Sequence, residues 1–483
     1  MSDQPSPSAV PESNAWRIAA LAMLTLLAVA AALLVPEHEP WFDEVQAWFL
    51  ARDASPWDIL WKYARYEGST SLWHMLLTIP AKAGAPPMAL NCISAALALA
   101  GAALLLFRSP FPPYLRVLLP ATYFFFYQYG IVARNYALLM PLLWLVAVVY
   151  PRRFEHPWRY VGMLIVVTQV SLHAAWMGGS LMLCFLWEAW RREKWPLARL
   201  VPFTLAFAVD TALIVAQLFP PSDIYGPPWE KMDQARIFTA LSELIFLTVL
   251  PWPALAALVL ICAGCFFYTR GVLLSYLLSV SGLMALFIFR FYSVWHGGML
   301  FALLILHTWL AWVSPVRRSI GRVADHWWPT VTAGALTFTA IVQVYWSAMA
   351  GWHDWQYPYS GSREAAEYLR EHGIDRQRVH AFKFATCAVL VGLDRNPFTN
   401  IKPFMAGFFW VWTKQIFAGQ TPAALVQDKP EWIMAGAQLR PAVDVVPPPL
   451  PGYALDHVFS GRIIWKDGFY RTDSYYLYKR VAP

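Results

Sequence analysis

The stretch WRIAALAMLTLLAVAAALLV, residues 16–35, decides the fold. It contains one charged residue, Arg17, and an apolar helix of about 20 residues is long enough to cross a bilayer core of about 30 Å. Pro36-Glu-His-Glu-Pro40 follows it in place of a small-residue cleavage site. We therefore expect a first membrane span that is retained rather than removed as a signal peptide. Residues 1–15, rich in Ser and Pro, are predicted to be disordered.

The composition extends this expectation to most of the chain. Of its 483 residues, 58% are hydrophobic and 14% are charged. A soluble protein has about a quarter charged residues, so this chain lacks the polar surface that water requires. The 26 Trp, 22 Tyr and 30 Phe residues also favour a membrane interface. The net charge of +7 comes from short clusters between apolar runs, which is typical of cytoplasmic loops. We therefore expect the chain to be embedded in membrane lipid and not to bind nucleic acid.

Eleven apolar runs are predicted to cross the membrane. These are 16–35, 88–107, 114–130, 135–150, 158–175, 177–191, 198–219, 237–269, 271–290, 296–314 and 328–350. With these spans, all the basic clusters between runs fall on one side, which the positive-inside rule makes cytoplasmic. Residues 70–84 are also apolar, but a crossing there would reverse every later cluster. We place that segment on the outer surface.

The predicted fold is a polytopic α-helical membrane protein with a small C-terminal α/β domain outside the cytoplasm. The membrane domain covers residues 16–350 and carries an external loop at 36–87, in which Pro56–Tyr66 has the apolar spacing of an interfacial amphipathic helix. The C-terminal domain covers residues 351–483. It is predicted to contain a helix that begins at Ser362 and ends near Glu371. Strands are predicted at 378–382, 431–434, 461–465 and 474–479.

Ionisable side chains are energetically unfavourable in or near a bilayer, so their presence there indicates a functional or structural role. In this topology seven of them share the outer face: Asp43, Glu44, Glu67, Arg134, His173, Arg290 and His296. A carboxylate can accept the proton of an attacking hydroxyl, and fixed cations stabilise the charge on a departing phosphate. Taken singly, each has a structural interpretation as well: a helix cap for the acidic pair, lipid headgroup contact for Arg134, a turn for His173, and interface anchoring for Arg290 and His296.

Two stretches resemble a known superfamily. Glu39-Pro-Trp-Phe-Asp-Glu-Val-Gln-Ala-Trp48 and Tyr66-Glu-Gly-Ser-Thr-Ser-Leu-Trp73 resemble the first external loop of the GT-C membrane glycosyltransferases. Arg134-Asn135-Tyr136 looks like the second external motif of that superfamily. His173 and the Arg290…His296 segment are similar to later positions in bacterial members. The chain departs from the pattern after Gly68, where Ser69-Thr70 replaces the usual His-Pro-Pro.

The resemblance implies inverting transfer of a sugar from a polyprenyl-phosphate donor to a glycan, lipid or protein hydroxyl. By this mapping Asp43 is the general base, and Glu44 or Glu67 orients hydroxyl groups. The donor would be held by a set of polar residues, with Arg134, helped by Arg290 or His296, on its phosphate. That set also includes Asn135, Tyr136 and His173. Because the sequence has no dense Asp/Glu/His cluster, we favour a reaction with no metal and no other cofactor. The resemblance to bacterial members implies a location in the inner membrane of a bacterium.

Two other functions fit a polytopic chain. A transporter or lipid flippase places polar residues at mid-bilayer and often has internal repeats. Here the charges gather at the ends of spans and no repeat is evident, although Asp210 lies near the middle of one. A non-enzymatic scaffold would bind through the C-terminal domain and would have no cavity between Asp43 and Arg134.

Overall fold

The computed structural model describes residues 14–225, 237–239, 241–289, 293–321, 324–418, 420–440, 442 and 449–481. Within these ranges, six helical segments are long and apolar enough to cross a membrane. They are α1 (Asn14–Glu37), α6 (Ala89–Arg108), α11 (Leu197–Leu218), α14 (Pro253–Arg270), Val294–Trp312 with α16 (Gly297–Trp312), and α17 (Ala324–Gln356). Their length and composition are those of a helical membrane protein.

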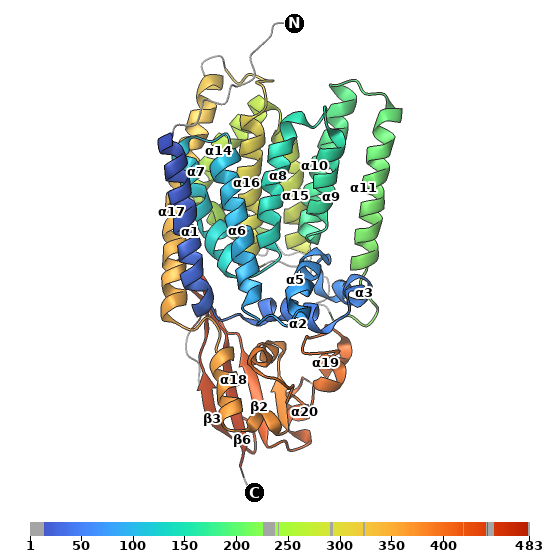
Figure 1. Ribbon diagram of the computed structural model, residues 1–483, viewed down its shortest axis with the longest axis vertical. Helices are drawn as coiled ribbons and strands as arrows, with labels where there is room; N and C mark the ends of the chain where they lie inside the picture. Colours follow the sequence, from blue (N-terminus) through green and yellow to red (C-terminus); the bar gives the residue numbers. More distant parts are fainter. Residues whose placement is uncertain are drawn as a thin grey trace.

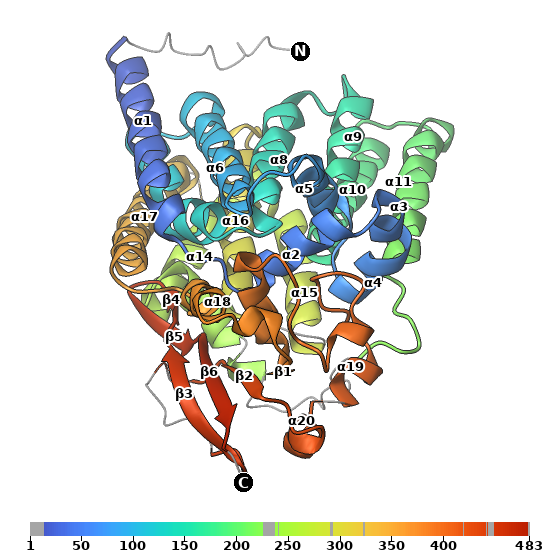
Figure 2. The ribbon, with the colours of Figure 1, turned by 60° about the horizontal axis from the view of Figure 1, so that its bottom comes forward.

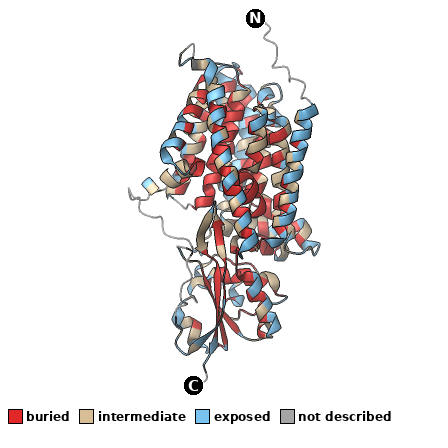
Figure 3. Cartoon of the chain, turned by 90° about the vertical axis from the view of Figure 1, so that its left-hand side faces the viewer, coloured by how far each residue is buried: buried red, intermediate tan, exposed pale blue. Residues whose placement is uncertain are grey.

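The outer helices turn large apolar side chains away from the protein. On α1, Ile18 is 68% exposed and Leu26 is 60% exposed; Leu205 and Val209 on α11 are each 60% exposed. In the view of Figure 3, the bundle carries exposed residues on its outer helices and buried residues toward its centre. A continuous apolar exterior of this kind is unfavourable in water and is expected where the solvent is hydrocarbon.

Six further helices of the described chain belong to the bundle. They are α7 (Pro113–Leu118), α8 (Tyr136–Val149), α9 (Pro157–Thr168), α10 (Leu172–Arg191), α13 (Leu247–Val249) and α15 (Leu273–Phe289). One sequence-based boundary is wrong. The break predicted near residue 176 lies at 169–171, where the Ser171 hydroxyl accepts from the Ala174 N–H at the start of α10. The apolar run 237–269 is broken at its two prolines, Pro251 and Pro253: α13 ends at Val249 and Pro253 begins α14.

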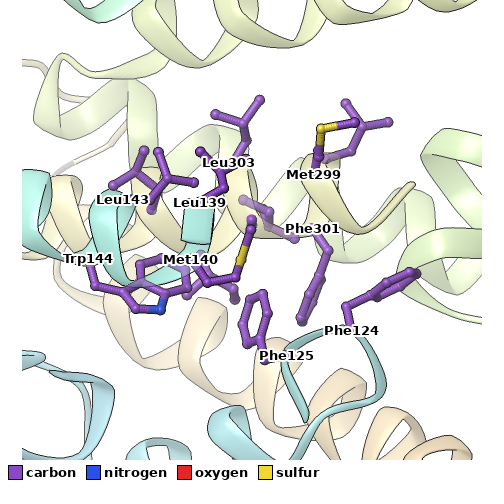
Figure 4. Packing of buried hydrophobic residues seen from close by; sticks show 14 of the residues in the cluster. Phe124, Phe125, Leu139, Met140, Leu143, Trp144, Met299, Phe301 and Leu303 are labelled. Carbon is purple, nitrogen blue, oxygen red and sulfur yellow. The ribbon is translucent and has the colours of Figure 1, made fainter. Parts of the chain in front are cut away.

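Aromatic and aliphatic side chains from three elements fill the centre of the bundle (Figure 4). Phe125, from the helical turns Tyr123–Ile131, packs edge-to-face on Trp144 of α8 and lies 5.1 Å from Phe301 of α16. Trp144 also stacks on Trp309 of α16. All four rings are at least 95% buried. This packing fixes the segment before residue 134, which carries a candidate site residue.

The external loop is mostly helical. It contains α2 (Phe42–Asp53), α3 (Pro56–Asp58), a helical turn at Ile59–Tyr63, α4 (Ala64–Glu67) and α5 (Leu72–Lys82). With 11 residues, α5 is about 16 Å long, too short to cross a bilayer. In the 56–67 stretch Ile59 and Ala64 are buried, while Trp57 is 69% exposed.

The C-terminal region forms a mixed sheet with strand order β1-β2-β6-β3 beneath the bundle (Figures 1 and 2). Its strands are β1 (Val379–Phe382), β2 (Trp432–Ala437), β3 (Tyr453–Phe459) and β6 (Ser474–Arg480), and α18 (Ser362–Glu371) is found where it was predicted. The β1–β2 pair is parallel and the other two pairs are antiparallel. The boundary predicted at residue 351 falls inside α17, which ends at Gln356.

A hairpin of β4 (Arg462–Trp465) and β5 (Gly468–Thr472) joins the C-terminal region to the bundle. Trp465 packs edge-to-face on Tyr123, and the Lys466 ammonium lies 4.0 Å from the ring of Trp346 on α17. Separately, α2 and α5 share one hydrophobic cluster with the segment Phe384–Gly392 and with the sheet. The external loop is thus packed between the bundle and the C-terminal region, as Figure 1 shows.

Candidate active site

A cavity of about 300 Å³ lies where the external loop meets the bundle. Its walls come from α2, the turn after α4, α5, the start of α8, the start of α10, and the segments on either side of residues 290–292. The lining residues that carry polar groups are Asp43, Glu67, Ser69, His74, Arg134, Asn135, Tyr136, Ser171, His173 and His296. Seven residues predicted to form the site, spread over more than 250 positions, therefore face one cavity.

Asp43 and Arg134 form an ion pair in this cavity, Nη1 to Oδ2. Asp43 lies in the first turn of α2, and Arg134 follows the tightly packed Tyr123–Ile131 segment. Their side chains are 27% and 23% exposed, so a ligand in the cavity can reach both. Arg134 also lies 5.9 Å from the ring of Trp41 and 5.8 Å from that of Tyr136, which restrict its movement. The pair thus presents a carboxylate and a guanidinium side by side.

Glu67 is the second carboxylate of the cavity. It ends α4, and Gly68 follows it with a φ of 65°, a conformation that favours glycine. Gln46 donates from Nε2 to Glu67 at 2.7 Å and to the carbonyl of Trp410 at 2.8 Å. Burial raises the pKa of Glu67 to about 7, and the nearby negative charge of Asp43 adds to the rise. Glu67 can therefore exchange a proton near neutral pH.

We expect Glu67→Gln to remove part of the pH dependence of stability. Because the folded-state pKa exceeds the ordinary value of 4.5, the folded protein binds the proton more tightly, and stability falls as pH rises from about 4.5 to 7. The amide keeps an acceptor for Gln46 and carries no charge. The variant's thermal unfolding midpoint should match that of the wild type near pH 4 and exceed it at pH 8. An equal midpoint at pH 8 would show that Glu67 is not desolvated.

Three histidines line the cavity. Burial, together with the charge of Arg134, lowers the pKa of His74, on α5, to about 4, so this imidazole is neutral. The rings of His173 and His296 lie 5.0 Å apart, and His296 stacks on Phe287 at 5.4 Å. The Ser293 N–H donates to His296 Nδ1 at 3.0 Å, which fixes that ring. These histidines add polar groups to the lining of the cavity that also contains Asp43 and Glu67.

Glu44 does not line the cavity, contrary to the prediction of a catalytic role. Oε1 accepts from Asn91 Nδ2 at 2.9 Å and from the Ala133 N–H at 2.6 Å. Oε2 accepts from His38 Nε2 at 3.0 Å and from the Trp41 N–H at 3.3 Å. A carboxylate that is fully buried and holds four donors has no access to a substrate. Its contact with Ala133 instead positions Arg134.

His38 joins Glu44 to the end of α17. Its Nδ1 lies 2.8 Å from Asp354 Oδ2, and all three side chains are almost fully buried. Burial alone would lower the pKa of His38, but the carboxylates of Asp354 and Glu44 raise it to about 10. The imidazolium therefore donates from both nitrogens and links the external loop to the bundle.

Some features of the site were not expected from the sequence. Gln46 lies one helical turn after Asp43, a spacing that places both on the same face of α2. The contact of Gln46 with Trp410 brings the C-terminal region next to the site. Arg290, predicted to help Arg134, lies outside the described residues.

Within the described parts of the chain, no group of three or more His, Cys, Asp or Glu side chains is arranged to hold a metal ion. Asp210, near the middle of α11, accepts from Thr168 Oγ1 at 2.7 Å and from Gln169 Nε2 at 2.6 Å. These bonds connect α11 to the end of α9 and account for a buried carboxyl group there.

In comparisons with known proteins, no family model, no curated protein and no solved structure matches the chain. The function must therefore be inferred from the cavity itself.

Proposed function

We propose that the cavity is the active site of an inverting membrane glycosyltransferase. The donor would be a sugar carried on a polyprenyl phosphate and the acceptor a hydroxyl group of a glycan, lipid or protein. The pairing of Asp43 with Arg134, 91 positions apart, within a cavity that Glu67 and three histidines also line, is the observation that carries the proposal. Such a set combines a base with a cation for phosphate.

The reaction requires little else from the protein. Asp43 takes the proton of the acceptor hydroxyl, whose oxygen attacks the anomeric carbon. The bond between that carbon and the phosphate oxygen breaks, and its electron pair leaves on the phosphate. Arg134 stabilises this charge in a site with little water. Because the attack comes from the face opposite the phosphate, the anomeric configuration inverts.

The ion pair also suggests how donor binding prepares the base. While Asp43 is paired with Arg134, the guanidinium occupies its carboxylate oxygen Oδ2. A bound phosphate would compete for the guanidinium and release Asp43 toward the acceptor. Glu67, partly protonated near pH 7, would hydrogen-bond to hydroxyl groups of the sugar or acceptor. Asn135, Tyr136, His173 and His296 would complete the walls around the donor.

The proposal includes a location. The cavity and the C-terminal region lie at the same end of the bundle (Figure 1), while the basic clusters that follow α8, α10 and α14 lie at the other. Under the positive-inside rule the latter end faces the cytoplasm. The cavity would then open on the periplasmic side of a bacterial inner membrane, where the lipid carrier presents its sugar.

Arg134→Gln tests the role of the cation. We expect the purified variant to bind polyprenyl monophosphate roughly 10- to 100-fold more weakly than the wild type, since one charge-assisted contact contributes about 1.5–3 kcal/mol. Arg52→Gln is the matched control, because Arg52 lies at the far end of α2 and pairs with Asp53 outside the cavity. Equal binding by the wild type and Arg134→Gln would rule out this phosphate site.

A further inference from the structure

The structure has a second polar cavity, at the end of the bundle opposite the candidate active site. It measures about 90 Å³ and is lined by Arg153, Glu188, Arg192, Arg318 and the segment Gly271–Ser275. The helix α10 connects the two sites, since His173 in its first turn lines the first cavity and Glu188 in its last turns lines the second. At about 1.5 Å per residue, they lie roughly 22 Å apart.

Arginines from three separate loops converge on Glu188. Arg153 Nη2 lies 2.7 Å from Oε2, while Arg192 and Arg317 approach Oε1 at 2.5 Å and 3.4 Å. Arg318 lines the same cavity, and no acidic partner of Arg318 is found in the described chain. Four guanidinium groups against one carboxylate leave a local net charge of +3. The positive-inside rule accounts for basic residues at this end, but not for their convergence on one cavity.

Two further features indicate an anion. Arg153 is 6% exposed, and its Nε has no hydrogen-bond partner although it is buried beside the cavity. Leu273–Ser275 form the first turn of α15, a helix of 17 residues, and the N–H groups of a first turn have no acceptor within the helix. A helix N-terminus that faces arginines is the usual arrangement for binding phosphate.

The backbone makes room for these groups at Gly271. Its φ is 74°, and a side chain there would meet Arg317 at 3.0 Å and Arg192 at 3.5 Å. Glycine thus satisfies both the turn after α14 and the close approach of two arginines.

We propose that this cavity binds a phosphate group, supplied either by the headgroup of an anionic phospholipid or by free inorganic phosphate. The volume admits a phosphate group but not a nucleoside. Trp187, which lines the cavity, and Trp190 lie on the last turns of α10 and are half-exposed, as side chains at the level of lipid headgroups often are. The site does not depend on the proposed glycosyl transfer.

The test uses the full-length protein purified in a neutral detergent, with Arg318→Gln as the main variant. Binding of short-chain phosphatidylglycerol and of inorganic phosphate is measured by the shift in thermal midpoint, with phosphatidylcholine and chloride at matched ionic strength as references. Arg318 has no carboxylate to leave unpaired, so the variant should fold. Arg191→Gln is the control, because Arg191 is exposed on the same helix end and stacks on Trp187 and Trp190.

We expect Arg318→Gln to weaken binding of one probe about tenfold or more, with Arg191→Gln unchanged. Loss confined to phosphatidylglycerol identifies a lipid headgroup, and loss confined to inorganic phosphate identifies a free anion. Wild-type binding of both probes by Arg318→Gln overturns the proposal. So does an equal loss in Arg191→Gln, which would reflect surface charge alone.

Discussion

Asp43→Asn is expected to lower the rate of sugar transfer by about 10²- to 10⁴-fold, the usual contribution of a general base. The amide preserves the size of the side chain and can still accept a hydrogen bond from Arg134, so the cavity should keep its shape. It cannot take the proton of the acceptor. The measurement is the initial rate of transfer in membranes that contain equal amounts of inserted protein.

Asp53→Asn is the control for that experiment. Asp53 ends the same helix, pairs with Arg52 and accepts from the Phe408 N–H at 2.7 Å, an acceptor role that an amide retains. Its rate should match the wild type. A rate for Asp43→Asn within a factor of two or so of the wild type would remove Asp43 as the base and leave Glu67 as the remaining carboxylate in the cavity.

His38→Gln should cause the largest loss of stability, about 3–5 kcal/mol, because it leaves the buried carboxylates of Glu44 and Asp354 without their shared cation. The pH dependence follows from the raised pKa. The stabilisation is fully present below the ordinary pKa of 6.5 and is lost as pH rises through about 10. Thermal unfolding in detergent between pH 6 and 10 should therefore show a wild-type midpoint that falls toward that of the variant.

His372→Gln serves as the comparison, since His372 is exposed, hydrogen-bonds to the carbonyl of Tyr368 and stacks on the Tyr368 ring, away from any carboxylate pair of this kind. It should leave the midpoint unchanged at every pH. If His38→Gln also unfolds at the wild-type midpoint at pH 6, the three residues do not hold the external loop against α17.

The sequence was sufficient where a local pattern determines the structure. Length and hydropathy predict α1, and Gly373, with a φ of 64°, follows α18 where a stop was expected. Four of the C-terminal strands were located from β-favouring runs, but β3 and β5 were missed. The strand β3 has a largely exposed, mixed sequence without the alternation that signals a half-buried strand.

Placing the charged loops on one side of the membrane was enough to group Asp43 with Arg134 and the histidines. The same approach could not separate Asp43 from Glu44. Consecutive helical residues point about 100° apart, and which of them faces the cavity depends on how α2 packs. Glu44 turns toward Asn91 and His38, and His38 meets Asp354 across 316 positions. Contacts between residues so far apart in the sequence depend on tertiary packing, and no local sequence pattern predicts them.

The most direct test of the proposed function compares lipid extracts from three strains by mass spectrometry: wild type, a strain that lacks this protein, and that strain complemented with Asp43→Asn. A polyprenyl-phosphate sugar should accumulate in the second and third strains and return to the wild-type level when the wild-type gene is restored. Identical amounts of every lipid-linked sugar in all three strains would contradict a glycosyltransferase that uses this cavity.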